Sequence, residues 1–349
     1  MTNEPDFNRI RTALLGGQPD RVPLFELGIS KSVKEPFLGK KIITLKDELE
    51  FLSKAGYDYI KLSPIIDMNP GKTIPKDGSR ISEATDHTDE RSWHSSGQGK
   101  IISIEDFENF RWPQANEVDY SPFEKIQEVL PSGMKIIGQY GDIFTWVWDF
   151  MGFETFSFAL VDNEELVRLM FDKIGTIVLN LFENMVSFDK IGALFYTDDI
   201  AINSGLFVSP AVYRTYLFPW MEKIGRLCQN KDIPFIYHTD GNIWTVFDDI
   251  KKCGVNAIHP IEPQAMDIRE VKQKYGNTFC LNGNVDVDLL SRSTPDEIRE
   301  IVKGLLKDIA PGGGFCLGSG NSVPEYAKFE NYKAMVETVH QFGKYPISV

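Results

Sequence analysis

The feature that most constrains the fold of this chain is the regular return of short apolar segments. Three of them begin at residues 233, 255 and 277, so 22 residues separate each start from the next. A stretch with apolar residues at helical spacing follows each of the first two. Parallel strands need a crossover connection, usually a helix, so the repeat predicts alternating strands and helices in a parallel sheet.

Eight segments in all have the apolar, β-branched and aromatic composition of strands. They are Arg21–Gly28, Tyr57–Ser63, Lys135–Gln139, Ile191–Thr197, Ile233–His238, Val255–His259, Asn277–Asn282 and Gly313–Gly318. Eight such units predict an α/β fold, a single (β/α)8 TIM barrel over residues 1–349. An open doubly wound sheet is the alternative, although no GxGxxG or GxxxxGK loop follows the first segment.

Residues 64–130, after the second strand, contain no segment of barrel type. Gly, Ser, Asp and His are frequent there, around Arg80–Glu83 and Arg91–His94. We therefore expect residues 64–130 to form an insertion, with a hairpin followed by a helix over Pro122–Val129.

The charge of the chain excludes some classes of partner. The formal net charge is −13 and the isoelectric point is about 5.0, without a basic stripe. Such a surface repels phosphate groups, so we expect neither nucleic acid nor an acidic membrane as a partner. The four cysteines are too dispersed for a zinc knuckle or a disulfide framework, and no apolar run has the length of a membrane span. These features favour the cytoplasm.

Polar side chains follow almost every predicted strand, at the end where barrel enzymes build their reaction sites. They are Glu26, Tyr140, Asp142, Asp198, Asp199, His238, Asp240, His259, Glu262, Asn282, Asn284, Asp286, Ser319 and Asn321. The sequence therefore predicts a functional site at this end of the barrel.

Two histidines and two acids within this set form a candidate metal site. His238 and Asp240 are two residues apart and should share one face of a strand end. His259 ends the next strand, about 4.8 Å away, and Glu262 follows it. Mixed imidazole and carboxylate ligands suit zinc or another divalent metal. The alternative is structural, with a hydrogen-bonded loop histidine, a core histidine and a carboxylate that caps a turn.

Asp198 and Asp199 are candidates for a general acid. Two adjacent carboxylates raise the pKa of one of them by repulsion, which favours a protonated group near neutral pH. The alternative is that they cap a helix or hold a loop by hydrogen bonds.

An aromatic-rich stretch follows the third predicted strand, over residues 140–158. Its rings can wall an apolar pocket at the barrel mouth or pack in the core. Asn282 and Asn284 can orient a ligand or form a turn around Gly283. The residues that we expect to bind a substrate are Tyr140, Trp146, Trp148, Asn282, Asn284 and Ser319.

Several short motifs over residues 190–346 match a known pattern. They are Thr197-Asp-Asp-Ile, Val208-Ser-Pro, Tyr213-Arg, Phe218-Pro, Tyr237-His-Thr-Asp-Gly-Asn, Ile258-His-Pro-Ile-Glu-Pro, Asn282-Gly-Asn-Val-Asp, Pro311-Gly-Gly-Gly and Glu330-Asn-Tyr. In these motifs the chain resembles the uroporphyrinogen decarboxylase superfamily. The resemblance implies the same (β/α)8 barrel.

The superfamily contains tetrapyrrole decarboxylases and methyltransferases that serve corrinoid proteins. The decarboxylases carry an arginine-rich stretch after the first strand, which holds the carboxylates of the substrate. Residues 24–31 of this chain contain no arginine and place Glu26 there instead. A polycarboxylate substrate is therefore disfavoured, and we count Glu26 among the catalytic candidates.

Thiol-activating methyltransferases of the superfamily have cysteine where this chain has Asp240 and Ser319. An oxygen-rich site is a harder Lewis acid than a thiolate site. The resemblance then implies a methyltransferase that moves a methyl group from a small methoxylated substrate, aromatic ones included, to a corrinoid carried by a partner protein. Two alternatives stay open: a decarboxylase-like lyase for a carboxylated substrate without metal, and a non-catalytic barrel that presents a tetrapyrrole or corrinoid.

Overall fold

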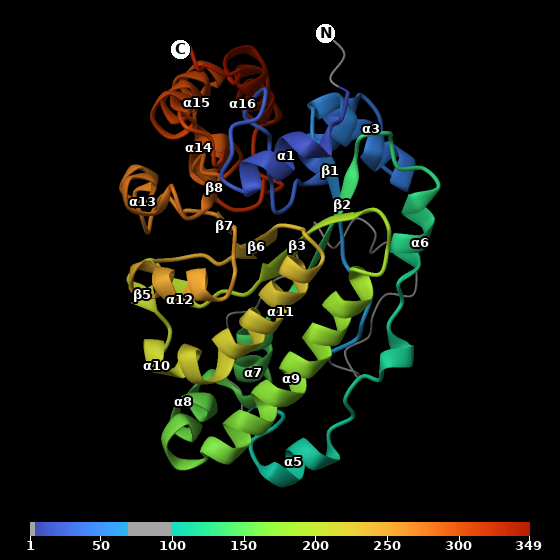
Figure 1. Cartoon of the computed structure of the whole chain (residues 1–349), viewed down its shortest axis with the longest axis vertical. Helices are drawn as coiled ribbons and strands as arrows, with labels where there is room; N and C mark the ends of the chain where they lie inside the picture. The colour runs from blue at the N-terminus through green and yellow to red at the C-terminus, as the bar shows by residue number, and fades with distance from the viewer. Residues whose placement is uncertain (1–3, 69–98) are drawn as a thin grey trace.

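The computed structural model describes residues 4–68 and 99–349, and it has an α/β fold built on one parallel sheet (Figure 1). Seven strands lie in the order β1-β2-β3-β6-β7-β8-β9. Their bounds are β1 Tyr59–Leu62, β2 Lys135–Gly141, β3 Ile191–Thr197, β6 Phe235–His238, β7 Ala257–His259, β8 Cys280–Asn282 and β9 Phe315–Cys316. All neighbouring pairs are parallel, and each strand falls within or overlaps a segment predicted from the sequence.

The first predicted strand, residues 21–28, does not form a strand of this sheet. The segment makes one parallel bridge to the end of β9, between Leu24 and Leu317. Leu317 N donates to Pro23 O (2.9 Å), and Phe25 N donates to Leu317 O (2.9 Å). Toward β1, Glu26 N donates to the side-chain Oη of Tyr59 (3.0 Å). The segment therefore pairs with the end of β9, and toward β1 its Glu26 N–H is bound by a side chain rather than by the β1 backbone.

Helices connect the strands and cover the sheet (Figure 1). The principal ones are α1 Phe7–Leu14, α2 Lys31–Leu38, α3 Leu45–Ala55, α7 Ile143–Met151, α8 Phe153–Asp162, α9 Glu164–Met185, α11 Phe218–Asn230, α12 Phe247–Lys252, α13 Ile268–Tyr275, α14 Val287–Arg292, α15 Pro295–Ile309 and α16 Phe329–Phe342. Local chemistry sets their ends. Thr44 and Asp47 form a capping box at the start of α3, and Gly56 (φ 91°) ends it.

The connection between β1 and β2 contains α5 (Ile104–Asn109), a short 3-10 turn (Ala115–Glu117) and α6 (Ser121–Gln127). The predicted helix over Pro122–Val129 corresponds to α6. α5 lies far from the sheet, beside α9 at the bottom of Figure 1. The predicted hairpin around residues 80–94 lies outside the described residues, so the insertion as a whole stays a prediction.

The long helix α9 packs across β2, α7, α8 and α11. Gly175 makes the contact with α11 close, because a Cβ there would lie 2.3 Å from the Trp220 ring. β3 ends in the small hairpin β4 (Ala201–Ile202) and β5 (Gly205–Leu206), at the carboxyl edge of the sheet. In the described part of the chain, no helix is both long and apolar enough to cross a bilayer.

Candidate active site

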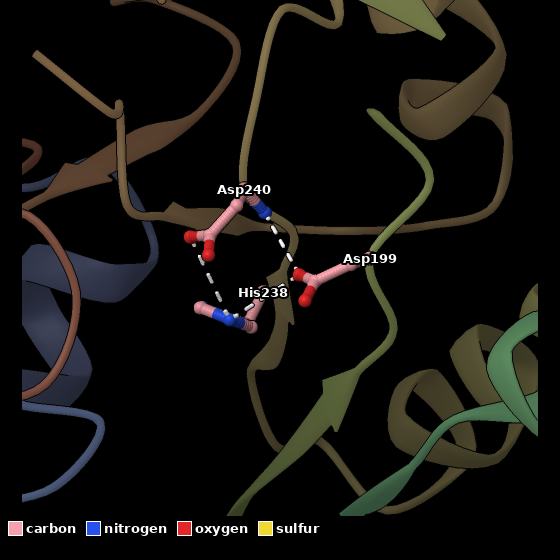
Figure 2. A group of neighbouring side chains, drawn as sticks. All are labelled: Asp199, His238 and Asp240. Atoms are coloured by element: carbon pink, nitrogen blue, oxygen red, sulfur yellow. Dashed lines mark hydrogen bonds and ion pairs between the residues drawn. The ribbon is translucent and has the colours of Figure 1, made fainter. Parts of the chain in front are cut away.

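Three polar side chains converge where β3 and β6 end (Figure 2). His238 is the last residue of β6, and its partner in the register with β3 is Thr197. Asp199 follows β3 by two residues, and Asp240 follows His238 by two. His238 Nε2 lies 3.6 Å from Asp199 Oδ1 and 3.9 Å from Asp240 Oδ1. One donor atom from each residue lies within 4.8 Å of the others, so this group can hold a metal ion.

Hydrogen bonds hold the two strand ends together. Asp240 N donates to Asp199 Oδ1 (3.0 Å), and Asn321 Nδ2 donates to Asp240 Oδ2 (2.7 Å). Gly241 makes the turn after Asp240 with φ 84°, and a Cβ there would lie 2.5 Å from the Ala201 carbonyl carbon. The sequence Asp240-Gly241 is therefore needed to bring the β6 loop against the β4 segment.

His259 lies behind His238 and contacts its other ring nitrogen. The two Nδ1 atoms are 2.9 Å apart, and both rings are buried. Phe25 and Phe195 pack on His259, with ring centroids at 5.3 and 6.0 Å. Burial, followed by the charges of His238 and Lys61, holds the pKa of His259 well below its usual value. His259 is therefore neutral at physiological pH.

Glu262 supports the turn that follows Asp240. Its Oε2 accepts a hydrogen bond from Gly241 N (2.7 Å), and burial raises its pKa. The prediction grouped His238 and Asp240 with His259 and Glu262. The structure instead groups them with Asp199, because His259 is bound to His238 and Glu262 supports the turn after Asp240.

Asp198, one of the two predicted general acids, is buried at the N-terminus of α7. It accepts hydrogen bonds from Phe144 N (2.7 Å), Thr145 N (3.0 Å), Thr145 Oγ1 (2.9 Å) and Tyr196 Oη (2.5 Å). Burial, with the charge of Asp142, raises its pKa to about 7. The geometry matches the helix-capping alternative, and only Asp199 of the pair faces His238.

Glu26 is linked to the three-residue cluster through Ser319 and Asn321. Ser319 N donates to Glu26 Oε1 (2.8 Å). Ser319 Oγ lies 2.5 Å from Glu26 Oε2 and 2.9 Å from Asn321 O. Burial raises the pKa of Glu26 to about 8, against the hydrogen bonds from Ser319. A hydroxyl carries one proton, so a protonated Glu26 can donate to Ser319 while Ser319 donates to Asn321.

The predicted substrate-binding residues have varied surroundings. Trp146 stacks on Phe150 and Trp148 meets the Phe153 ring edge-on, with centroids at 5.4 and 6.0 Å, so both half-buried indoles contribute to packing. Tyr140 is the next-to-last residue of β2, and burial raises its pKa.

The two predicted asparagines differ from each other. Asn284 Nδ2 donates to Ile261 O (2.6 Å), which holds the loop after β7. Asn282 is fully buried, and its Nδ2 has no hydrogen-bond partner among the described residues. Asn282 is therefore available to a ligand, whereas the amide of Asn284 is engaged.

Lys61 is a polar residue of the interior that the sequence reasoning missed. It lies on β1, and its buried Nζ has no hydrogen-bond partner in the described parts of the chain. Nζ is 5.7 Å from the centroid of the Phe195 ring. Burial lowers its pKa to about 7, against the charge of Glu26. The sequence does contain a signal for Lys61. A lysine within the apolar run Tyr59–Leu62 has to face either the helices or the interior.

Comparison with known proteins identifies the family. The sequence pattern described as Uroporphyrinogen decarboxylase (URO-D) matches residues 98–342, more than half of the chain. The uroporphyrinogen decarboxylase of Coxiella burnetii is 24% identical over 261 residues, which cover 70% of this chain and 68% of that protein. The uroporphyrinogen decarboxylase of Actinobacillus succinogenes is 28% identical over 137 residues, 38% of this chain and only 37% of that protein.

Among solved structures, a methyltransferase from Methanosarcina mazei has a similar fold. Its TM-score is 0.64 at 17% sequence identity, and the alignment covers 98% of this chain and 99% of that one. This likeness shows the fold, while the match of residues 98–342 shows the family. The chain belongs to the uroporphyrinogen decarboxylase family.

Proposed function

We propose that this protein is a methyltransferase that removes a methyl group from a small methoxylated compound and transfers it to a corrinoid on a partner protein. The observation that carries the proposal is the cluster of Asp199, His238 and Asp240 at the ends of β3 and β6, with donor atoms within 4.8 Å of one another. Cleavage of a methyl ether needs activation of the oxygen that leaves, and this cluster is suited to that task.

The donor set fits a divalent metal such as zinc. One imidazole nitrogen and two carboxylate oxygens are a combination used in metal sites with an open position. His238 also has the support that metal-bound histidines usually have, since His259 contacts its Nδ1 and leaves Nε2 directed at the two aspartates. A metal held there would act as a Lewis acid on the ether oxygen of the substrate.

The surrounding residues can manage the proton that the reaction requires. When the methyl group leaves, the substrate oxygen keeps the electron pair of the broken bond and needs a proton. Glu26 is protonated at neutral pH because burial raises its pKa to about 8. Ser319 and Asn321 connect it to Asp240. A protonated Glu26 can act as a general acid toward a group that contacts its own carboxyl or the Ser319 hydroxyl, while Asn321 fixes the position of Asp240.

Two further facts support this function over thiol activation. The structure of the methyltransferase from Methanosarcina mazei aligns with 98% of this chain. Asp240 and Ser319 stand where the thiol-activating members of the superfamily, which the chain resembles, have cysteine. Both residues carry oxygen in place of sulfur, and Ser319 is hydrogen-bonded to Glu26.

The test is methyl transfer to a reduced corrinoid protein from a panel of methoxylated aromatic and aliphatic compounds, followed by the absorption change of the corrinoid. We expect transfer from at least one compound, and a loss of about 100-fold or more in His238→Ala. His340→Gln is the matched control, because His340 contacts Ala55 O on α3, away from the cluster. No transfer from any compound, with the protein folded and metal-loaded, would count against the proposal.

A decarboxylase-like lyase is the second candidate, because the matched curated relatives are named uroporphyrinogen decarboxylases. Against a polycarboxylate substrate stands the segment at residues 24–31, which has no arginine and buries Glu26 instead. Release of carbon dioxide from a porphyrinogen by the metal-free protein would favour the lyase. Binding of a corrinoid with neither activity would favour a non-catalytic barrel.

A further inference from the structure

Three buried polar side-chain atoms on the barrel strands have no hydrogen-bond partner among the described residues. They are Lys61 Nζ on β1, His259 Nε2 on β7 and Asn282 Nδ2 on β8. Two of them lie near the centroid of the Phe195 ring, which is 5.7 Å from Lys61 Nζ and 6.0 Å from the centroid of the His259 ring. Buried polar groups are rarely left unpaired, so this concentration points to a ligand.

The strand register brings Asn282 next to His259. β7 and β8 pair Ala257 with Cys280 and Ile258 with Leu281. The next step of the same register sets His259 beside Asn282, on neighbouring strands about 4.8 Å apart. Both residues are fully buried. His259 and Asn282 are therefore neighbours across β7 and β8.

All three groups can donate hydrogen bonds. The Lys61 ammonium and the Asn282 amide are donors by their chemistry. His259 donates from Nε2 when its Nδ1 accepts the proton of His238, which is the arrangement that leaves His238 Nε2 for a metal. A set made only of donors, one of them cationic, is complementary to an anion with several acceptor oxygens.

The negative groups near Lys61 are already engaged. Both oxygens of Glu26 contact Ser319. Glu48 forms an ion pair with Lys34 (2.9 Å). Glu26 is protonated at neutral pH, since burial raises its pKa to about 8. Burial lowers the pKa of Lys61 to about 7, and an anion bound beside it would favour the protonated, cationic form of Lys61.

Lys61 also has free space beside it. Lys61 and Glu26 line a cavity of about 40 Å³, between residues 26–29, β1 and α3. One water needs roughly 10–15 Å³ by this measure. The cavity therefore has room for about three or four water-sized groups, enough for the three heavy atoms of a carboxylate.

We propose that Lys61 and Asn282 form a subsite for a carboxylate of the substrate, so that the methoxylated substrates of this protein are carboxylic acids. The inference rests on the proposed function only in assuming that the substrate carries a methoxy group. The carboxylate subsite itself is tested by binding, without metal, corrinoid or turnover.

The experiment is isothermal titration calorimetry with two matched pairs of probes. These are 4-methoxybenzoate with 4-methoxybenzamide, and methoxyacetate with methoxyacetamide. Within at least one pair, we expect the wild-type protein to bind the carboxylate about 10-fold or more tightly than the neutral amide, because a hydrogen bond to a charged group discriminates by that order. This comparison requires no variant and so does not depend on folding of a mutant.

The variants assign the preference to particular residues. Lys61→Met should weaken carboxylate binding by about 10- to 100-fold and abolish the preference over the amide. Asn282→Ala should weaken it by about 3- to 10-fold. Lys231→Met, which removes an exposed lysine, is the control for net charge and should bind as the wild type does.

Two outcomes overturn the inference. In the first, no carboxylate binds at millimolar concentration, or each amide binds as tightly as its carboxylate. In the second, Lys61→Met, shown to be folded by its circular dichroism, keeps the preference. If carboxylates bind through Lys61 but no methyl transfer follows, the subsite stands and the proposed methyltransferase function fails.

Discussion

His238 and His259 face each other across β6 and β7, with their Nδ1 atoms 2.9 Å apart. At this distance one ring donates a proton and the other accepts it. A metal on His238 Nε2 requires the proton of His238 on Nδ1, so His259 must accept. In the proposed metal site, the second histidine of the predicted set would act through the first, as a positioning residue.

The variant His259→Ala should keep all three cluster residues and still lose metal affinity. Loss of the partner that orients a metal-bound histidine typically costs about 10- to 100-fold in affinity. Competition with a chromophoric chelator measures this constant. His259→Gln can accept the proton and should recover part of the loss, which a merely space-filling role does not predict. Unchanged affinity in His259→Ala would refute the positioning role.

Asp198 and Asp199 are neighbours in the chain with different predicted effects. Asp198→Ala leaves four donors of Tyr196 and α7 without their acceptor, two of them buried, so the free energy of unfolding should fall by about 3 kcal/mol or more. Asp199→Ala should cost about 1 kcal/mol and abolish metal binding. Urea unfolding and metal analysis of both variants separate the two roles. Metal binding lost in Asp198→Ala and kept in Asp199→Ala would reverse the assignment.

Glu26 should make stability depend on pH. Its pKa is about 8 in the folded chain, against about 4.3 for an unperturbed glutamate. The folded protein therefore holds a proton that the unfolded chain has released, and this stabilisation is complete below about pH 4 and lost as the pH rises through 8.

The comparison with Glu26→Gln isolates this contribution, because glutamine does not titrate. Between pH 5 and 8 the free energy of unfolding of the wild type should fall by about 2–4 kcal/mol relative to the variant. Urea unfolding at several pH values measures the difference. Parallel curves for the two proteins would show that Glu26 is ionised in the folded state throughout this range.

The sequence was sufficient for most of the fold, because strand composition and helix spacing are local signals. β3 was predicted with its observed bounds, Ile191–Thr197. The segment at residues 21–28 has strand composition, but its contacts with β1 are made by side chains, through Tyr59 Oη and the Phe25 ring. Whether a segment joins both of its neighbours depends on contacts far away in the chain, and composition does not report them.

The candidate site was predictable as a location but not as a set of contacts. The rule that barrel sites form at strand ends brought His238, Asp240 and Asp199 into view. The sequence did not show that Asp199, rather than His259 and Glu262, joins His238 and Asp240. That grouping depends on the contact between the two histidine rings and on one hydrogen bond from Gly241 N to Glu262. Lys61 was missed because an isolated lysine in a strand has no motif.

In the proposed function, methyl transfer depends on a metal held by Asp199, His238 and Asp240. The most direct measurement strips and refills one preparation with zinc, and follows the rate of methyl transfer to a reduced corrinoid protein against the metal bound per chain. We predict that activity disappears on stripping, returns in proportion to metal up to one equivalent, and does not return in Asp240→Ala. Methyl transfer at an undiminished rate by the stripped protein would contradict the claim.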